Sequence, residues 1–227
     1  MPPRALEPAG VALVDKPAGP SSFAIVSQIR RVTGARTGHA GTLDPFATGL
    51  LLLLSGRSTK LTPKLVGLDK RYLTEVDLTA RTSTGDPDGD VVDTLEPPLE
   101  HELERRLVLL RGAIELPIPA ASAVKIGGQR AYALARRGVE VEMPLRRSTV
   151  YSLDVVSYTG GTVTLDLRVS SGTYIRAIAH ALGGHCASLR RTAVGPFAIA
   201  DAVTPDAFTP EWLLSEATVL TLVEGAR

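Results

Sequence analysis

The chain has 227 residues, enough for a large domain with its own core, and its 25 Lys and Arg side chains nearly balance its 24 Asp and Glu. This balance excludes a strongly basic or acidic protein, and the single cysteine, Cys186, excludes an internal disulfide and fits a reducing cytoplasm. The apolar run Leu50–Leu54 is far too short to span a bilayer, so we expect a cytoplasmic protein.

Arginines cluster along the chain although the net charge is close to zero. A basic face on a neutral protein can still bind phosphates, and scattered solvated charges are an equally good interpretation. The clusters are Arg30, Arg31 and Arg36, then Arg136, Arg137, Arg146 and Arg147, then Arg190 and Arg191.

The first part of the chain predicts two strands around a helix. Residues 10–15 form a short apolar strand, and residues 50–54 form a strand that is apolar on both faces. Between them, Ser21 or Ser22 caps a helix that Gly34 closes. The apolar stripe of this helix is Ile25, Val26, Ile29 and Val32. Residues 56–68 predict a short helix interrupted at Pro63.

The rest of the chain mixes hairpins with helices. Residues 72–79 alternate as a strand, and 149–169 form a hairpin around Gly160-Gly161. Helices are predicted over 99–111 and 174–182, the second with Tyr174, Ile178, Ala181 and Leu182 on one face. Residues 82–90 are a loop, 188–203 are mostly extended, and the tail from 205 is a short helix and an apolar stretch. This order predicts an α+β fold with a mixed or antiparallel sheet.

Residues 38–49, GHAGTLDPFATG, are the segment around which the chain is organised. Three glycines allow a tight backbone and close approach of a ligand. Asp44 stands before Pro45, which favours an extended backbone at Asp44, so a carboxylate is held on a stiff turn before a buried strand. Composition alone favours an ordinary turn aspartate.

The string HAGTLDPFATGLL resembles the catalytic motif of the TruB family, the tRNA pseudouridine-55 synthases. Further segments resemble that family in the same order, over roughly residues 10–200. They are DKPAG at 15–19, DKRY at 69–72, SAVK at 122–125, SGTYIR at 171–176 and LRR at 189–191. The resemblance implies that Asp44 is the catalytic aspartate.

The resemblance also implies the pseudouridine synthase fold, a bent mixed or antiparallel sheet flanked by helices. We expect a catalytic domain over residues 1–200, with an RNA-gripping thumb insertion at about 117–148. Residues 201–227 are then a short C-terminal tail, too short for the PUA-type RNA-binding domain that family members usually carry.

A carboxylate in an apolar pocket needs a cationic partner to stay ionised, and Arg176 is the candidate. Arg176 falls in the first turn of the helix predicted over 174–182, where the helix dipole disfavours a cation, so an anionic partner is expected. An exposed surface arginine is the alternative.

A flipped-out uridine needs an aromatic face, and Tyr72 and Tyr174 are candidates. Each also fits a simple core position. The resemblance implies that Tyr72 stacks on the uracil, that Tyr174 packs nearby and that His39 holds the flipped nucleotide outside the pocket. Leu189 is expected to line that pocket.

Four cations are candidates for the RNA backbone. Arg146 and Arg147 are chosen by their position in the expected thumb. Lys16 and Lys125 could meet phosphates, stabilise the loop or be solvated. The expected partner is the T-arm stem-loop of tRNA, bound by a monomer.

No cofactor and no metal are expected, because the isomerisation is redox-neutral and His180, His185 and Cys186 lack metal-ligand spacing. The sequence DPDGD at 86–90 resembles part of a calcium loop but lacks the required downstream glutamate.

Two other functions compete with uridine isomerisation. Ser122 and Lys125 form an S-x-x-K pattern, which some serine acyl-hydrolases use, although the companion K-T-G is absent. A non-catalytic RNA-binding module is the other, and Asp44 argues against it because a carboxylate repels phosphate.

Overall fold

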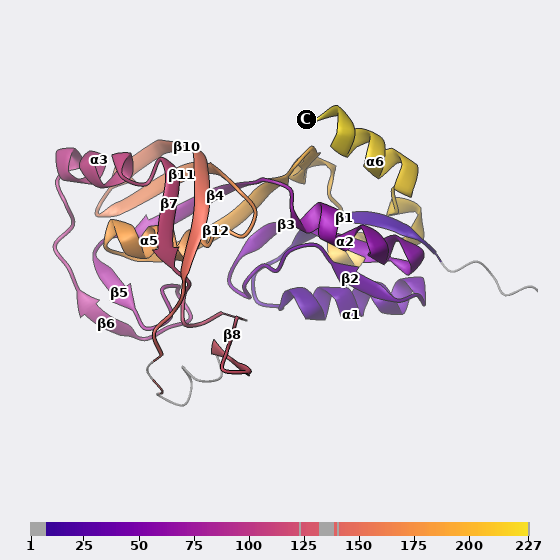
Figure 1. The fold of residues 1–227 in the computed structure, drawn as a ribbon, viewed down its shortest axis with the longest axis horizontal. Helices are drawn as coiled ribbons and strands as arrows, with labels where there is room; N and C mark the ends of the chain where they lie inside the picture. Colours follow the sequence, from indigo (N-terminus) through magenta and orange to yellow (C-terminus); the bar gives the residue numbers. More distant parts are fainter. Residues whose placement is uncertain (1–7, 123, 132–138, 140, 227) are drawn as a thin grey trace, which may run out of the picture. The chain divides into compact units, whose positions relative to one another are not determined.

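The computed structural model describes residues 8–122, 124–131, 139 and 141–226 (Figure 1). The chain divides into two compact units, the first formed by Met1–Tyr72 with Arg190–Arg227 and the second by Leu73–Leu189. Strands β4 (Lys70–Asp77) and β12 (His185–Val194) contribute residues to both units. Arg136 and Arg137, part of the predicted basic clusters, lie outside the described residues.

The first unit is built around β3 (Thr48–Ser55), the predicted leucine strand. Strand β1 (Gly10–Lys16) pairs antiparallel with β3 along its whole length, and β2 (Thr37–His39) also pairs antiparallel with it. Strand β12 pairs with β3 in parallel, and β13 (Phe197–Ala198) pairs antiparallel with β12. The sheet is therefore mixed, as predicted.

Both faces of β3 are buried, which explains its unbroken run of leucines. Leu50, Leu52 and Leu54 share a core with Leu65 of α2 (Thr62–Val66) and with Val219 and Val223 of α6 (Glu216–Gly225). Because side chains alternate along a strand, Leu51 and Leu53 face the other side. Helices α1 (Ser22–Thr33) and α6 lie on opposite sides of β1 and β3 in Figure 1.

Helix α1 has the predicted caps but a different last turn. The Ser21 side chain accepts a hydrogen bond from Ala24 N, and Gly34 closes the helix at φ 64°. Val32, predicted to be on the apolar stripe, is 46% exposed, and Thr33 takes the buried position at the end of the helix. The stripe therefore ends at Ile29.

One prediction for the helical segments of the first unit is wrong. Pro63 does not interrupt a helix, because η1 (Gly56–Leu61) ends before it and Pro63 stands in the first turn of α2. A backbone N–H in the first turn has no acceptor within the helix, so the N–H that Pro63 lacks causes no loss of helix stability. After η2 (Ile199–Asp201), the tail predicted as a short helix and an apolar stretch contains η3 (Pro205–Ala207), η4 (Pro210–Trp212) and the helix α6.

The second unit has the strand order β12-β4-β11-β10-β7. The predicted hairpin around Gly160-Gly161 is confirmed as β10 (Leu145–Thr159) and β11 (Thr162–Val169), and β10 also pairs antiparallel with β7 (Gly112–Pro117). Side chains alternate between buried and exposed along β4, as predicted.

Two helices and two small hairpins complete the second unit. Helix α3 (Glu100–Val108) is shorter than predicted, and α5 (Ile175–Leu182) matches its prediction except that Ala181 is exposed. The hairpins are β5 (Ala80–Thr82) with β6 (Val91–Thr94), and β8 (Lys125–Ile126) with β9 (Gln129–Arg130). None of the helices in the described ranges has both the length and the apolarity needed to cross a membrane.

Candidate active site

The Asp44 loop, residues 40–47, connects β2 to β3 in the first unit. Asp44 is half-buried, and its carbonyl accepts a hydrogen bond from Ala47 N at 3.2 Å, which closes a turn. Gly49 follows the loop with φ 102°, and a Cβ on it would lie 2.3 Å from the carbonyl oxygen of Arg191. The backbone of β12 therefore packs directly against the end of the loop.

Lys16 is buried beneath this loop and holds its main chain. The Lys16 ammonium donates to the carbonyls of Pro17, Pro45 and Ala47 at 2.9, 3.0 and 2.6 Å. Burial lowers the pKa of Lys16 to about 8, an effect that the negative charge of Asp44 opposes. Lys16 was a candidate for the RNA backbone, but its side chain is fully buried and its donors are occupied, so that prediction is wrong and its other proposed role, loop stabilisation, holds.

Arg191 holds the same loop from the side of β12. Its guanidinium donates to the carbonyls of Leu50, Gly41 and Thr42 at 2.7, 3.1 and 3.5 Å, and its side chain is 1% exposed. Its neighbour Arg190 forms a bidentate pair with Asp15 at 2.8 and 3.1 Å. Of the two arginines in this predicted basic cluster, Arg191 is therefore buried and holds the loop, and Arg190 is paired with Asp15.

Ser22 at the start of α1 and Gly19 just before the helix also hold the loop. The Ser22 hydroxyl donates to the Leu43 carbonyl and accepts from Leu43 N, both at 2.8 Å. Gly19 N donates to the Pro45 carbonyl at 2.9 Å. The backbone on each side of Asp44 is thus fixed from β1, α1 and β12.

His39 ends β2, immediately before the Asp44 loop. Its ring is half-buried, and its Nδ1 has no hydrogen-bond partner among the described residues. Burial lowers the pKa of His39, and the charge of Arg191 lowers it further. His39 is therefore a neutral imidazole at neutral pH, and its buried Nδ1 lacks a hydrogen-bond partner among the described residues.

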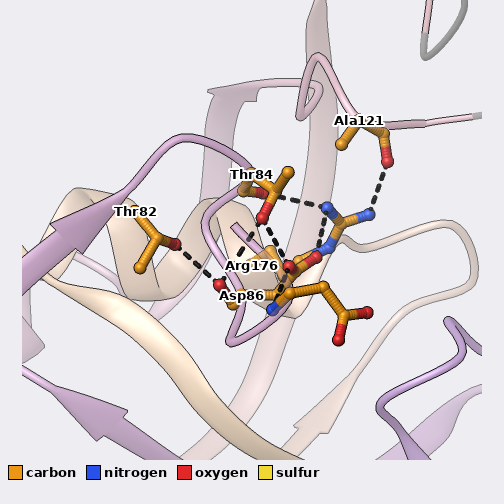
Figure 2. A network of polar contacts seen from close by, with 6 residues as sticks. Thr82, Thr84, Asp86, Ala121 and Arg176 are labelled. Atoms are coloured by element: carbon orange, nitrogen blue, oxygen red, sulfur yellow. Dashed lines mark hydrogen bonds and ion pairs between the residues drawn. The ribbon is translucent and has the colours of Figure 1, made fainter. Parts of the chain in front are cut away.

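Arg176 is buried in the second unit and paired with a carboxylate (Figure 2). Its Nη1 lies 3.0 Å from Asp86 Oδ2 and 3.0 Å from the Thr84 carbonyl, and its Nη2 donates to the Ala121 carbonyl at 2.8 Å. This pairing overcomes the unfavourable helix dipole and excludes the exposed-arginine alternative.

Asp86 is held in place by other residues of the loop between β5 and β6. The Asp86 carboxylate accepts from the Thr84 hydroxyl and from Asp88 N, and the Asp86 carbonyl accepts from the Thr82 hydroxyl at 2.7 Å. The segment that resembled a calcium loop therefore turns its first carboxylate toward an arginine. Sequence reasoning missed Asp86, because Asp88 and Asp90 stand in the same loop and the sequence does not distinguish among the three.

Tyr72, Leu189 and Tyr174 are distributed over both units. Tyr72 on β4 is 7% exposed in the first unit, and Leu189 on β12 is 8% exposed in the second. Tyr174 caps α5 and lines a small hollow together with Arg146, Ser148 and Thr173. The structure thus brings Tyr174 and Arg146 together.

The remaining candidate cations differ in their surroundings. Lys125 is exposed at the start of β8, and Arg147 is exposed but pairs with Glu115 at 3.1 Å.

Ser122 is buried, and its hydroxyl has no hydrogen-bond partner in the described part of the chain. Lys125 therefore does not activate Ser122, which removes the geometric basis for a serine acyl-hydrolase.

Comparison with known proteins gives the chain its family. The model of the TruB family pseudouridylate synthases (N-terminal domain) matches residues 30–175. This chain belongs to the TruB family. The tRNA pseudouridine synthase B of Mycobacterium sp. (strain KMS) is 42% identical over 221 residues, which cover 92% of this chain and 74% of that protein. The protein of the same name from Bordetella avium is 42% identical and is covered to 86% of its length.

Solved structures confirm the pseudouridine synthase fold for this TruB family member. A chain in the crystal structure of a Cbf5-Nop10-Gar1 complex is 28% identical with a TM-score of 0.66, and the match covers 86% of this chain. The match covers 52% of that solved chain, about half of its length. A pseudouridylate synthase that is 16% identical has a TM-score of 0.55, which supports the fold alone.

Proposed function

We propose that this chain isomerises uridine 55 to pseudouridine in the T-loop of tRNA, with Asp44 acting on a flipped-out uridine. The observation that carries the proposal is the bracing of Asp44: Lys16, Arg191 and Ser22 all fix the main chain of its loop. Such bracing positions a reacting group, and the family whose model matches the chain is one of pseudouridylate synthases.

The reaction breaks the bond between C1′ and N1, turns the uracil and forms a bond between C1′ and C5, from which a proton is then lost. No atom is added and no electron is exchanged. One carboxylate is the minimum equipment. Asp44 is a candidate to attack C1′, to attack C6 or to remove the C2′ proton, and these three roles remain alternatives.

Other residues receive supporting roles in this proposal. Tyr72 supplies the face on which the uracil stacks, with Tyr174 and Leu189 packing nearby, and His39 contacts the flipped nucleotide outside the pocket. Arg176 partners Asp44 in the working enzyme, in addition to its contact with Asp86. Arg146, Arg147 and Lys125 contact the RNA backbone.

We further propose that the protein works as a monomer in the cytoplasm, without a cofactor, and grips the T-arm with an insertion at about 117–148. The buried Cys186, the single cysteine of the chain, fits a reducing compartment.

The test is a tRNA transcript carrying tritium at C5 of uridine. Pseudouridine formation releases that tritium to water, and Asp44→Asn should reduce the release by several orders of magnitude while tRNA binding persists. Tritium release at the wild-type rate from Asp44→Asn would show that Asp44 is only a turn residue. Binding by the wild-type protein without any release would instead favour the non-catalytic RNA-binding module.

A further inference from the structure

One face of α1 carries an exposed aromatic ring near its start and a cation near its end. Phe23 is 73% exposed, and Arg30, also exposed, lies two turns further along the same face. Ser27 lies between them and donates to the Phe23 carbonyl at 3.0 Å. We call Phe23, Ser27 and Arg30 the α1 stripe, and its rise along the helix axis is about 10 Å.

The core of the first unit does not account for Phe23. The buried side chains of α1 are Ile25, Val26 and Ile29, together with the small polar Ser22 and Thr33 at its ends, and Phe23 is not among them. Two other phenylalanines, Phe197 and Phe208, are 2% and 4% exposed. An aromatic ring left in water contributes little to folding and is available to a partner.

The charge around the stripe favours a polyanion as that partner. Helix α1 contains no acidic residue, and in the part of the chain that the structure describes neither Arg30 nor Arg31 forms an ion pair. Helix α3 is different, because its Arg105 and Arg106 follow three glutamates on the same helix. Of these two helices, α1 is the one that combines an exposed aromatic ring with arginines that form no ion pair among the described residues.

The stripe begins at the Asp44 loop. Ser22, next to Phe23, makes the two 2.8 Å hydrogen bonds to the main chain of Leu43, next to Asp44. Thr42 and Pro45 of the same loop are exposed. A strand of RNA whose uridine reaches Asp44 therefore has Phe23 within reach of its neighbouring nucleotides.

We propose that the α1 stripe binds unpaired RNA nucleotides that flank the target uridine, with one base stacked on Phe23 and a phosphate held by Arg30. Aromatic stacking combined with cations along the backbone is the usual way in which single strands are bound, and every base offers a stacking face. The stripe thus adds affinity without selecting a base. This inference rests on the proposed function, since it takes the RNA to be the strand that delivers the target uridine.

The test measures binding of an unmodified tRNA transcript to the full chain in an Asp44→Asn background, so that the RNA is not converted. Phe23→Ala should weaken binding about tenfold, Phe23→Leu should weaken it similarly, and Phe23→Trp should restore it. Arg30→Gln should lower the slope of log K against log salt by about 0.7. The matched controls lie on and just after α3: Leu109→Ala, for a side chain 79% exposed, and Arg105→Gln, for an exposed arginine in a last turn.

Tritium release by the otherwise wild-type chain is measured in parallel and tests the proposed function separately. If release occurs but Phe23→Ala binds within twofold of its background, as Leu109→Ala should, the stripe proposal is overturned and the isomerase remains. If the chain binds tRNA through Phe23 but releases no tritium, the stripe is supported and the isomerase is overturned. Failure of the unsubstituted chain to bind tRNA at all would overturn both.

Discussion

Arg176 and Asp86 form an ion pair of 3.0 Å in which both side chains are more than nine-tenths buried. The arginine also donates to two main-chain carbonyls, of Thr84 and Ala121. A guanidinium held on three acceptors cannot reorient, so it presents a fixed positive charge. Asp86 is therefore a positioning residue, because it acts through Arg176.

Asp86→Asn removes the charge but keeps the shape, and takes from the buried Arg176 the carboxylate of its ion pair. We expect a loss of about 3–5 kcal/mol in the free energy of unfolding, measured by urea denaturation. The control is Asp88→Asn, which changes an exposed carboxylate in the same loop and should cost less than about 0.5 kcal/mol. Equal stability of the two variants would mean that the ion pair contributes nothing.

Arg176→Lys keeps a positive charge but replaces the planar fork by a single ammonium, which cannot reproduce the three contacts. We expect tRNA binding near the wild-type level and slow tritium release. Arg176→Ala should be slower still. In combination with Asp44→Asn, neither should reduce release below that of Asp44→Asn alone, because a partner cannot assist a missing group. A large additional loss of tRNA binding would identify Arg176 as a phosphate contact.

Lys16→Met leaves the Pro17, Pro45 and Ala47 carbonyls without their common donor. The lost hydrogen bonds outweigh the relief of burying a charge, so we expect a destabilisation of about 2 kcal/mol. Tritium release should fall about 100-fold, since a shift of about 1 Å at a reacting group has such an effect. Lys125→Met, at an exposed lysine, is the control for removal of a positive charge. Full activity of Lys16→Met would refute the bracing role.

His39 should titrate below its ordinary pKa of 6.5, because burial and Arg191 both disfavour its protonated form. Between the two pKa values the unfolded chain binds more protons than the folded one, so stability falls as the pH drops below 6.5. Titration of the His39 ring by NMR measures the direction. His39→Gln should remove this part of the pH dependence, and a ring that titrates at or above 6.5 would contradict the account.

Gly49→Ala places a methyl group 2.3 Å from the Arg191 carbonyl, at a φ of 102° that side chains rarely adopt. We expect a destabilisation of more than about 2 kcal/mol in thermal or urea unfolding, from strain and from the displaced β12 backbone. Gly38→Ala is the matched control on β2, because nothing lies within 4 Å of the added Cβ and φ is not positive. If both variants unfold alike, the close approach of β12 is not rigid.

The sequence predicted those features that depend on neighbouring residues. The caps of α1, the alternation along β4 and the hairpin at Gly160-Gly161 all follow from local periodicity and turn chemistry, and all three are confirmed. The fully buried leucine strand followed from the same reasoning. Val32 was misplaced because periodicity does not reveal where a helix leaves the core.

Partners that are distant in the sequence could not be predicted in this way. Lys16 reaches carbonyls up to 31 residues away, and Asp86 and Arg176 are 90 residues apart. Such pairs form only once the topology brings their strands and loops together. Every residue has a main-chain carbonyl, so the sequence does not show which carbonyls accept hydrogen bonds. The buried Lys16 and Arg191 could therefore not be distinguished from surface cations.

The braces of the Asp44 loop contact main-chain atoms, namely the carbonyls of Gly41, Thr42, Leu43, Pro45 and Ala47 and the amide of Leu43. Every residue type carries these atoms, so the direction in which Asp44 points does not depend on which side chains the loop displays. Thr42 and Pro45 are exposed and make no side-chain hydrogen bond to these braces. The loop surface can therefore be redesigned for other RNA partners while the carboxylate keeps its place, whereas Lys16, Ser22 and Arg191 tolerate no such freedom.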